Sequence, residues 1–498
     1  MKRIIAICFA ILGTLSAAQA SERYVIRSMT FEIEGRTRQY FIEKLVERKV
    51  GDEFPDREAL DAFLKDSRQI LLNERVLELA EVLPAFGEPV LQESGGEEKV
   101  YLVPVDILVR TKDTWNLIGL PYFRYDSNNG LLLALRGRDY NFFGTMQPLI
   151  LNVNWDFDTD GTQTPEVEAK FKFPFRAAEI DWAWDFDTAF SLPDWSEIDF
   201  YLDTGIAAEL PLGGHTLTLY ASQRLDVGAE DSAGVPYDDP YFFTSSLGAY
   251  YMWKVLQTKS YGNLTIQPKV NLAYRRKPEG LDDAGLAATP ALTPGITASI
   301  GRVNWVGNFR KGAKATATVS YPIDLSDGSA YVFLSGNASG FLNYGFVGPS
   351  ARLSGFARIN GSEDTSAGDP IRGVLDSRIK TTTALFLNLD LPFRVIRFLP
   401  GTWFKKSWMR SFHFEQHWSP FLDLALVETD DGLFLPKDAW VGAGLAVITY
   451  PAISRSFFVR ISVGWDLRDV LELKALSGTS LRDGAGIREF FFGVGHHY

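Results

Sequence analysis

Cysteine is almost absent from this sequence. The only one, Cys8, lies within the first 20 residues, so the rest of the chain has neither a disulfide nor a reactive thiol. Histidine is scarce as well, with 5 residues in a chain of 498. The adjacent pair His496-His497 could suggest a metal site, but no third ligand stands nearby in the sequence. We therefore expect no metal site and no stabilising disulfide framework.

An excess of positive charge and long apolar runs are also lacking. The net charge is −12, which argues against nucleic acid as a partner because such binding depends on Lys and Arg at phosphates. After the first 20 residues no run of about 18 apolar residues remains, so we expect no transmembrane helix. No nucleophile elbow, phosphate loop or His/Cys ligand spacing occurs. The sequence predicts neither an enzyme nor a cofactor.

The first 20 residues have the features of a secretory signal peptide. Lys2 and Arg3 precede the apolar stretch from Ile4 to Leu15, and Ala18-Gln19-Ala20 fits a cleavage site. An uncleaved anchor is the alternative, although the stretch is short for a helix that spans a bilayer. We expect an exported protein, held together without disulfides by something such as a large closed sheet.

Residues 21–112 are richer in charge than the whole chain and predict a small water-soluble domain. Thr30 to Gly35 alternates like a strand, and Arg38 to Arg48 has helical spacing, with Thr37 as N-cap. A second helix begins at Pro55-Asp56. Two strands, Val100–Pro104 and Val105–Arg110, complete a β-α-α-β-β order.

From Trp115 onward the pattern is that of amphipathic strands. Leu151–Phe157, Val167–Phe173, Asp181–Asp187 and Leu387–Leu391 each place apolar residues on one face and polar residues on the other. A soluble β-sandwich would show the same alternation. The signal peptide, the 13% aromatic content with 12 Trp and 36 Phe, and the absence of helical crossovers favour an outer-membrane β-barrel over residues 113–498.

Several short motifs suggest a family. They are Gly51-Asp52-Glu53-Phe54-Pro55, Asn141-Phe142-Phe143-Gly144-Thr145, Ile371-Arg372-Gly373-Val374, Phe421-Leu422-Asp423-Leu424-Ala425 and the aromatic end from Phe490 to Tyr498. Together they resemble the BamA/TamA-type superfamily of outer-membrane protein assembly factors (the bacterial surface antigen family), in which periplasmic POTRA domains precede a barrel. The first motif links the two predicted helices, so residues 21–112 resemble one POTRA domain; a plain α+β spacer is the alternative.

The resemblance implies a barrel of about 16 antiparallel strands. Our direct count of strand-like runs between Trp115 and Tyr498 is about 18, and we expect the smaller number because strand boundaries are hard to place from sequence. It also implies that the sixth extracellular loop, about residues 342–380, folds into the lumen and carries Arg372. Two positions depart from the family pattern, since Val374 replaces an aromatic residue and Ala425 replaces glycine.

Within the resemblance, the two central motifs predict a contact between loop and wall. Phe421, Asp423 and Ala425 share the lumen face of their strand, and the guanidinium of Arg372 can bind the Asp423 carboxylate through two parallel hydrogen bonds. Gly373 would allow close approach to the wall, and a small residue at Ala425 would leave room. The alternative is a solvated turn in which Arg372 and Asp423 do not meet.

Other candidate residues follow from the barrel prediction. Arg136 and Arg138 alternate with leucines and should point into the lumen. At the end of the chain, Phe490, Phe492, Gly495 and Tyr498 resemble the C-terminal β-signal of outer-membrane proteins. The last strand of any other barrel would look similar.

The resemblance implies a protein of the outer membrane whose N-terminal domain lies in the periplasm. Its function would be to insert client proteins by pairing their strands with the barrel seam. Its partners would be outer-membrane lipids and unfolded outer-membrane proteins, with periplasmic chaperones or accessory lipoproteins as further partners. A two-partner-type secretion pore, a lipid or protein translocation pore and a simple porin are the alternatives.

Overall fold

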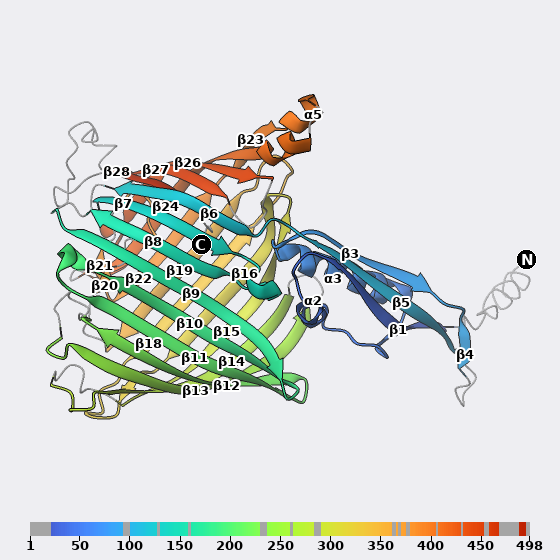
Figure 1. Ribbon diagram of the computed structural model, residues 1–498, viewed down its shortest axis with the longest axis horizontal. Helices are drawn as coiled ribbons and strands as arrows, with labels where there is room; N and C mark the ends of the chain where they lie inside the picture. Colours follow the sequence, from blue (N-terminus) through green and yellow to red (C-terminus); the bar gives the residue numbers. More distant parts are fainter. Residues whose placement is uncertain are drawn as a thin grey trace, which may run out of the picture. The chain divides into compact units, whose positions relative to one another are not determined.

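A computed structural model describes most of the chain after the predicted signal peptide (Figure 1). The described residues are 21–92, 100–126, 130–157, 161–229, 237–258, 262–282, 290–360, 365–366, 370–374, 379–404, 407–429, 432–452, 458–467 and 488–494. The chain divides into two compact units, Met1–Thr114 and Trp115–Tyr498. The boundary lies two residues after the one expected from the sequence.

The first unit is an α+β domain. Its elements are β1 (Ser21–Glu34), α2 (Gln39–Val46), β2 (Glu53–Phe54), α3 (Arg57–Asn73), β3 (Leu77–Phe86), β4 (Val90–Gln92) and β5 (Val100–Asp113). The sheet order is β2-β1-β5-β3, with β1 and β5 parallel and β3 antiparallel to β5. Both helices are amphipathic, and their fully buried Ile42, Leu60 and Leu71 form a core with residues of the sheet such as Val105.

The sequence-based assignment of the last two strands of this domain was wrong. Residues 100–113 form one strand, β5, rather than two, and the remaining long strand is β3, Leu77–Phe86. Pro104 does not interrupt β5, because a proline lacks only the N–H group; its carbonyl still accepts a hydrogen bond of 2.8 Å from the Gly87 amide. Thr37 is not the N-cap of α2 either, since Arg38 occupies that position.

The turn after β1 is held by the carboxylate of Asp113. Asp113 accepts hydrogen bonds from the Arg36 and Thr37 amides at 2.8 and 3.1 Å and from the Thr37 hydroxyl at 2.6 Å. Gly35 has a φ of 141°, and a Cβ at this position would lie 2.3 Å from the Asp113 side chain. The end of β5 is therefore tied to the start of α2.

We expect Asp113→Ala to destabilise the domain by about 3 kcal/mol, because it leaves backbone donors without their charged acceptor. Urea denaturation of a fragment covering residues 21–114 measures this. Asp61→Ala is the matched control, since Asp61 forms only an exposed pair with Arg57 on α3. Equal urea midpoints for the two variants would contradict the proposed role of Asp113.

An ionic contact between Arg27 of β1 and Asp106 of β5 makes the stability of the domain depend on pH in the acidic range. Hydrogen bonds from Arg27 and Ser28 lower the pKa of Asp106 to about 2. Because the folded pKa lies below the unfolded value of about 3.9, the contribution to stability is complete above that value and is lost as the pH falls towards 2. We therefore expect wild type to exceed Asp106→Asn in urea midpoint at neutral pH and to approach it near pH 2. A difference that persists at pH 2 would show that Asp106 acts by another route.

The second unit is a large antiparallel sheet that curls into a barrel (Figure 1). Its strands are β6 (Leu117–Asp126), β7 (Gly130–Asp139), β8 (Leu149–Phe157), β9 (Gln163–Ala177), β10 (Ile180–Ser191), β11 (Asp199–Leu212), β12 (His215–Val227), β13 (Tyr241–Thr258), β14 (Gly262–Arg276), β15 (Ala291–Val306), β16 (Phe309–Ser320), β17 (Ile323–Asp324), β18 (Val332–Phe341), β19 (Ser350–Ile359), β22 (Thr383–Asp390), β23 (Phe393–Phe398), β24 (Phe414–Thr429), β25 (Gly432–Leu433), β26 (Trp440–Pro451), β27 (Val459–Asp466) and β28 (Arg488–Val494).

The strands follow one another in chain order, and β28 stands next to β6. Within the described residues they occupy 18 positions, because the short β17, β23 and β25 each share a partner strand with a longer neighbour. This differs from the number of about 16 that the resemblance implies and agrees with the direct count of alternating runs. The difference arises because every amphipathic run forms its own strand, including Ser350–Ile359.

Short helical segments and a second small sheet connect the strands. They are η1 (Phe142–Gly144), η2 (Pro193–Trp195), α5 (Pro400–Phe404), η4 (Ser407–Phe412), η5 (Pro436–Asp438) and the pair β20 (Thr365–Ser366) and β21 (Lys380–Thr381). No helix within the described residues is long and apolar enough to cross a membrane.

The two faces of the barrel sheet differ as the alternation predicts. Along β24, Trp418 and Leu422 are exposed whereas His417, Phe421 and Asp423 are buried. Leu133 and Leu135 of β7 are likewise exposed on the outer face. An outer surface this rich in apolar side chains needs an apolar surrounding.

Candidate functional site

The candidate site is the tip of the loop that joins β19 to β22. The loop starts later than the expected boundary of 342, because residues 342–349 form a turn and Ser350–Ile359 form β19, which pairs with both β18 and β22. Gly368 and Asp369, which precede the motif Ile371–Val374 in the chain, lie outside the described residues. The described tip, Pro370–Val374, reaches the inner face of the wall formed by β22, β24, β26 and β27.

Arg372 forms the centre of the site and is 5% exposed. Its Nε donates to Asp423 Oδ2 at 2.7 Å and its Nη2 donates to Asp423 Oδ1 at 2.6 Å, which is the two-point contact expected from the sequence. The Arg372 amide adds a third hydrogen bond to the same carboxylate, 3.0 Å long. Asp423 is completely buried, so this ion pair is shielded from water.

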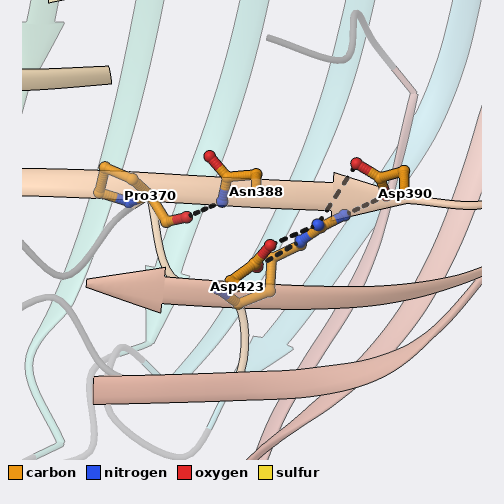
Figure 2. Close-up of polar contacts among 5 residues, drawn as sticks. Pro370, Asn388, Asp390 and Asp423 are labelled. Atoms are coloured by element: carbon orange, nitrogen blue, oxygen red, sulfur yellow. Dashed lines mark hydrogen bonds and ion pairs between the residues drawn. The ribbon is translucent and has the colours of Figure 1, made fainter. Parts of the chain in front are cut away.

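A second carboxylate completes the contact. Asp390, on the neighbouring strand β22, accepts from Arg372 Nη1 at 2.7 Å. Figure 2 shows Asp390 and Asn388 on one strand and Asp423 on the next, with the hydrogen bonds between them and the loop. Asn388 donates to the carbonyl of Pro370 at 2.6 Å. One guanidinium thus bridges two wall strands, and the loop backbone is hydrogen-bonded to the same two strands at Pro370 and at Arg372.

The aromatic ring of Phe421 lies under the guanidinium. The Arg372 Cζ atom is 3.9 Å from the ring centroid, a cation–π contact, and Phe421 is buried. Phe421 therefore covers the charged group on one side while the two carboxylates bind its edge.

Glycines allow the loop to touch the wall. Gly373 has a φ of +89°, and a Cβ there would lie 2.4 Å from the Trp465 amide nitrogen. Across the contact, a Cβ on Gly442 would lie 2.1 Å from the Arg372 carbonyl oxygen, and one on Gly464 would lie 2.8 Å from the Gly373 nitrogen. Backbone packs against backbone at this point, and no side chain fits between.

An apolar cluster surrounds the loop tip. It contains Ile371, Val374, Ile379, Ala384, Phe386, Ala425, Val427 and Trp440. Val374 and Ala425, the two departures from the family pattern, are 1% and 0% exposed. Both are therefore packing positions, and the valine contributes to the buried cluster in place of an aromatic residue.

The structure thus brings together all five residues expected at the loop contact, Arg372, Gly373, Phe421, Asp423 and Ala425. Sequence reasoning missed Asp390, Asn388, Gly442 and Gly464. Asn388 and Asp390 lie on the polar face of Leu387–Leu391, a run already recognised as amphipathic, so that face carried the signal. The two wall glycines gave no signal, because isolated strand glycines are common.

The two lumen arginines lie on the inner face of β7. The Arg136 guanidinium is 3.5 Å from the centroid of the Tyr122 ring, and Arg138 Nη1 donates to Asn152 Oδ1 at 2.7 Å. Their contacts are with the neighbouring strands β6 and β8, and both residues are partly buried.

The C-terminal motif is described only in part. Phe490 and Phe492 lie on β28, in register with Val463 and Ile461 of β27. Phe490 and Ile461 are each 40% exposed, which places this row of side chains on the outer face. Gly495 and Tyr498, and also His496 and His497, lie outside the described residues.

A cavity of about 330 Å³ adjoins the site, and Asn388 and Asp390 form part of its wall. The cations that line it are Arg310, Lys314 and Arg352, and the aromatic rings include Trp305, Phe309 and Tyr450. The loop contact itself presents two carboxylates, one guanidinium and no nucleophile, so its chemistry is suited to holding the loop in place.

Comparisons with known proteins yield similarity in structure alone. No family model and no curated protein sequence matches this chain. Among solved structures, CdiB from Acinetobacter baumannii is 12% identical with a TM-score of 0.49, and the match covers 94% of this chain and 73% of CdiB. BamA from Haemophilus ducreyi lacking POTRA domains 1–3 is 12% identical with a TM-score of 0.39, and the match covers 95% of this chain and 85% of that one. CdiB from Escherichia coli is 10% identical with a TM-score of 0.42, and the match covers 96% of this chain and 91% of that one.

Proposed function

We propose that this chain is an outer-membrane β-barrel with one periplasmic POTRA-like domain, and that it inserts client β-proteins into the outer membrane. The alternating barrel strands with their apolar outer face support the membrane placement. The β-α-α-β-β order of the small domain, extended by the short β2 and β4, supports the POTRA assignment.

The single observation that carries the proposal is the loop tip bound by Arg372 inside the barrel. A porin needs no such contact, whereas an insertase needs a wall that stays rigid while its seam opens. Arg372 and the wall glycines bind the loop to β22, β24, β26 and β27. These are the strands that lead up to β28, one side of the seam.

The seam between β6 and β28 is the place where the barrel would open. The other neighbouring strands in the ring are linked by the chain itself, but β6 and β28 are its two ends. Separating them stretches no connection and exposes backbone donors and acceptors that a client strand can pair with. In the small domain, β3 stands at the end of the sheet order and offers a similar edge to an extended client. Periplasmic chaperones or accessory lipoproteins would deliver these clients.

Depletion of the protein in its bacterium, followed by a quantitative census of outer-membrane proteins, tests this function. We expect the amounts of several β-barrel proteins to fall while lipoproteins stay unchanged. An unchanged census would contradict the proposal and favour a translocation pore. Planar-bilayer conductance then provides an independent check, because a large steady conductance fits a porin or secretion pore and a small flickering one fits an insertase.

A further inference from the structure

The cavity beside the loop contact lies on the inner face of the barrel and has a volume of about 330 Å³. Residues of β15, β16, β18, β19, β22, β24 and β26 line it. We call this space the lumen cavity. Its size falls at the lower end of the range of about 300–1,000 Å³ that is typical of sites for small molecules. The contacts that bind Arg372 do not require such a space, so the lumen cavity needs an explanation of its own.

Four buried rings line the lumen cavity in a continuous row. Phe309 stacks on His417 with ring centroids 4.4 Å apart, and the Tyr450 ring follows at 4.9 Å from His417. Phe458 continues the row, 5.4 Å from Tyr450. The imidazole is fixed in place, because its Nε2 lies 2.7 Å from a carboxylate oxygen of Glu415. Such a surface suits a planar aromatic group, which can stack on the rings or meet them edge to face.

Three cations line the same cavity. Lys314 of β16 and Arg352 of β19 are both in register with the same residue of β18, so they stand in one row across the sheet. Side chains opposite one another on neighbouring strands lie about 5 Å apart. The third cation, Arg310, contacts the rings of Trp305 and Phe341, with its Cζ atom 4.7 and 5.3 Å from their centroids. The cavity therefore has positively charged groups beside its aromatic row.

The balance of charge in the lining favours a ligand with a single negative charge. Asp390 is the only acid among the described residues that line the cavity. Its carboxylate already accepts a hydrogen bond of 2.7 Å from Arg372 Nη1. The three cations outnumber this acid and attract an anion, whereas a doubly charged group such as phosphate would be repelled more strongly by Asp390. A carboxylate meets both conditions.

Two buried polar atoms in the wall of the cavity have no hydrogen-bond partner within the described part of the chain. They are the Oγ of Ser419 and the Oδ1 of Asn388, and these residues are 1% and 2% exposed. The Asn388 amide nitrogen donates to the Pro370 carbonyl, and Figure 2 shows the Asn388 oxygen pointing away from that contact. A buried polar atom without a partner costs free energy. A ligand that offers an acceptor to Ser419 and a donor to Asn388 removes that cost.

We propose that the lumen cavity binds a small aromatic carboxylate that carries a hydroxyl group. The aromatic ring of the ligand packs against the four buried rings. The carboxylate lies near Lys314 and Arg352 and accepts a hydrogen bond from Ser419. The hydroxyl donates to Asn388 Oδ1. This assignment uses only the inner face of the barrel, so it does not rest on the proposed insertion of client proteins.

Fluorine NMR tests this binding with the full-length chain in detergent micelles. The probe is 4-fluoromandelate, which has one ring, one carboxylate and one hydroxyl. Two relatives each lack one feature, since 4-fluoromandelamide has no charge and 4-fluorophenylacetate has no hydroxyl. Titrations against micelles without protein correct for partitioning into detergent. We expect saturable binding of 4-fluoromandelate to wild type, with about tenfold weaker binding of the amide and about fivefold weaker binding of 4-fluorophenylacetate.

Substitutions in the lining locate the binding. Lys314→Gln should weaken the binding of 4-fluoromandelate about fivefold. Lys311→Gln is the matched control, because Lys311 lies on the other face of β16 and does not line the cavity. Ser419→Ala should weaken binding about threefold without lowering the unfolding temperature, since its Oγ has no partner among the described residues.

No saturable binding to wild type, in a sample whose heat-modifiable folded form is present, would overturn the proposal. Equal affinity for 4-fluoromandelate and its amide would show that the cations do not bind the ligand. Equal affinity of Lys314→Gln and Lys311→Gln would place the bound probe outside the lumen cavity. The titration is independent of client insertion, so a protein that binds 4-fluoromandelate but inserts no client would refute the proposed function and leave this inference standing.

Discussion

Arg372→Ala is expected to lower the free energy of barrel unfolding by about 3–5 kcal/mol, the cost of breaking a buried ion pair by removing one partner. The variant leaves the fully buried Asp423 and the nearby Asp390 without their shared cation. It also removes the group that covers the Phe421 ring. We expect the loop tip to detach from the wall and the barrel to unfold at lower temperature in the heat-modifiability assay.

Arg372→Lys separates charge from geometry at the same position. A lysine keeps the positive charge but cannot bind both carboxylates with a planar fork. We expect an intermediate loss of stability. Wild-type heat modifiability in Arg372→Ala would show that the loop is held by its apolar cluster alone.

Gly442→Ala is expected to have the second largest effect, about 3 kcal/mol of barrel stability. The added Cβ would lie 2.1 Å from the Arg372 carbonyl oxygen, so the loop tip has to move away from the wall. Such a displacement lengthens the hydrogen bonds from Arg372 to Asp423. The effect comes from the loop, because alanine is otherwise better tolerated than glycine inside a strand.

Gly340→Ala provides the matched control for this prediction. Gly340 lies on β18 of the same barrel, and a Cβ there meets nothing within 4 Å. We expect Gly340→Ala to be neutral or slightly stabilising. Thermal unfolding in detergent compares the two variants, and protease cleavage within residues 360–380 reports the release of the loop. If Gly442→Ala and Gly340→Ala behave alike, the wall glycine is not needed for loop contact.

The sequence alone predicted the part of the site that contains the arginine, because few residue types can serve as the partner of a buried arginine. A buried arginine needs an acid, and the period of β24 places Asp423 inward at a spacing that the family motifs also favour. Asp390 escaped prediction because an acid on the polar face of a barrel strand usually faces water. Gly442 and Gly464 escaped because their role depends on the exact path of the loop, which no local pattern encodes.

The fold was likewise predicted where a local pattern decides and missed where contacts between distant residues decide. The predicted alternation of apolar and polar residues along single barrel strands was correct, since it reflects only which face of the strand is apolar. The domain's β3 was missed, although Leu77, Ala80 and Val82 are buried. Its residues LELAEVLPAF mix helix-forming and strand-forming types, and pairing with β5 decides the outcome.

The rate of client insertion into vesicles tests the central claim most directly. Full-length protein is reconstituted into vesicles, a urea-unfolded outer-membrane β-barrel protein is added, and its folded, protease-resistant form is followed in time. We predict faster folding than in empty vesicles, with most of the acceleration lost in Arg372→Ala and retained in Gly340→Ala. A folding rate equal to that in empty vesicles, or full acceleration by Arg372→Ala, would contradict the proposal of an insertase whose loop tip is bound to the barrel wall by Arg372.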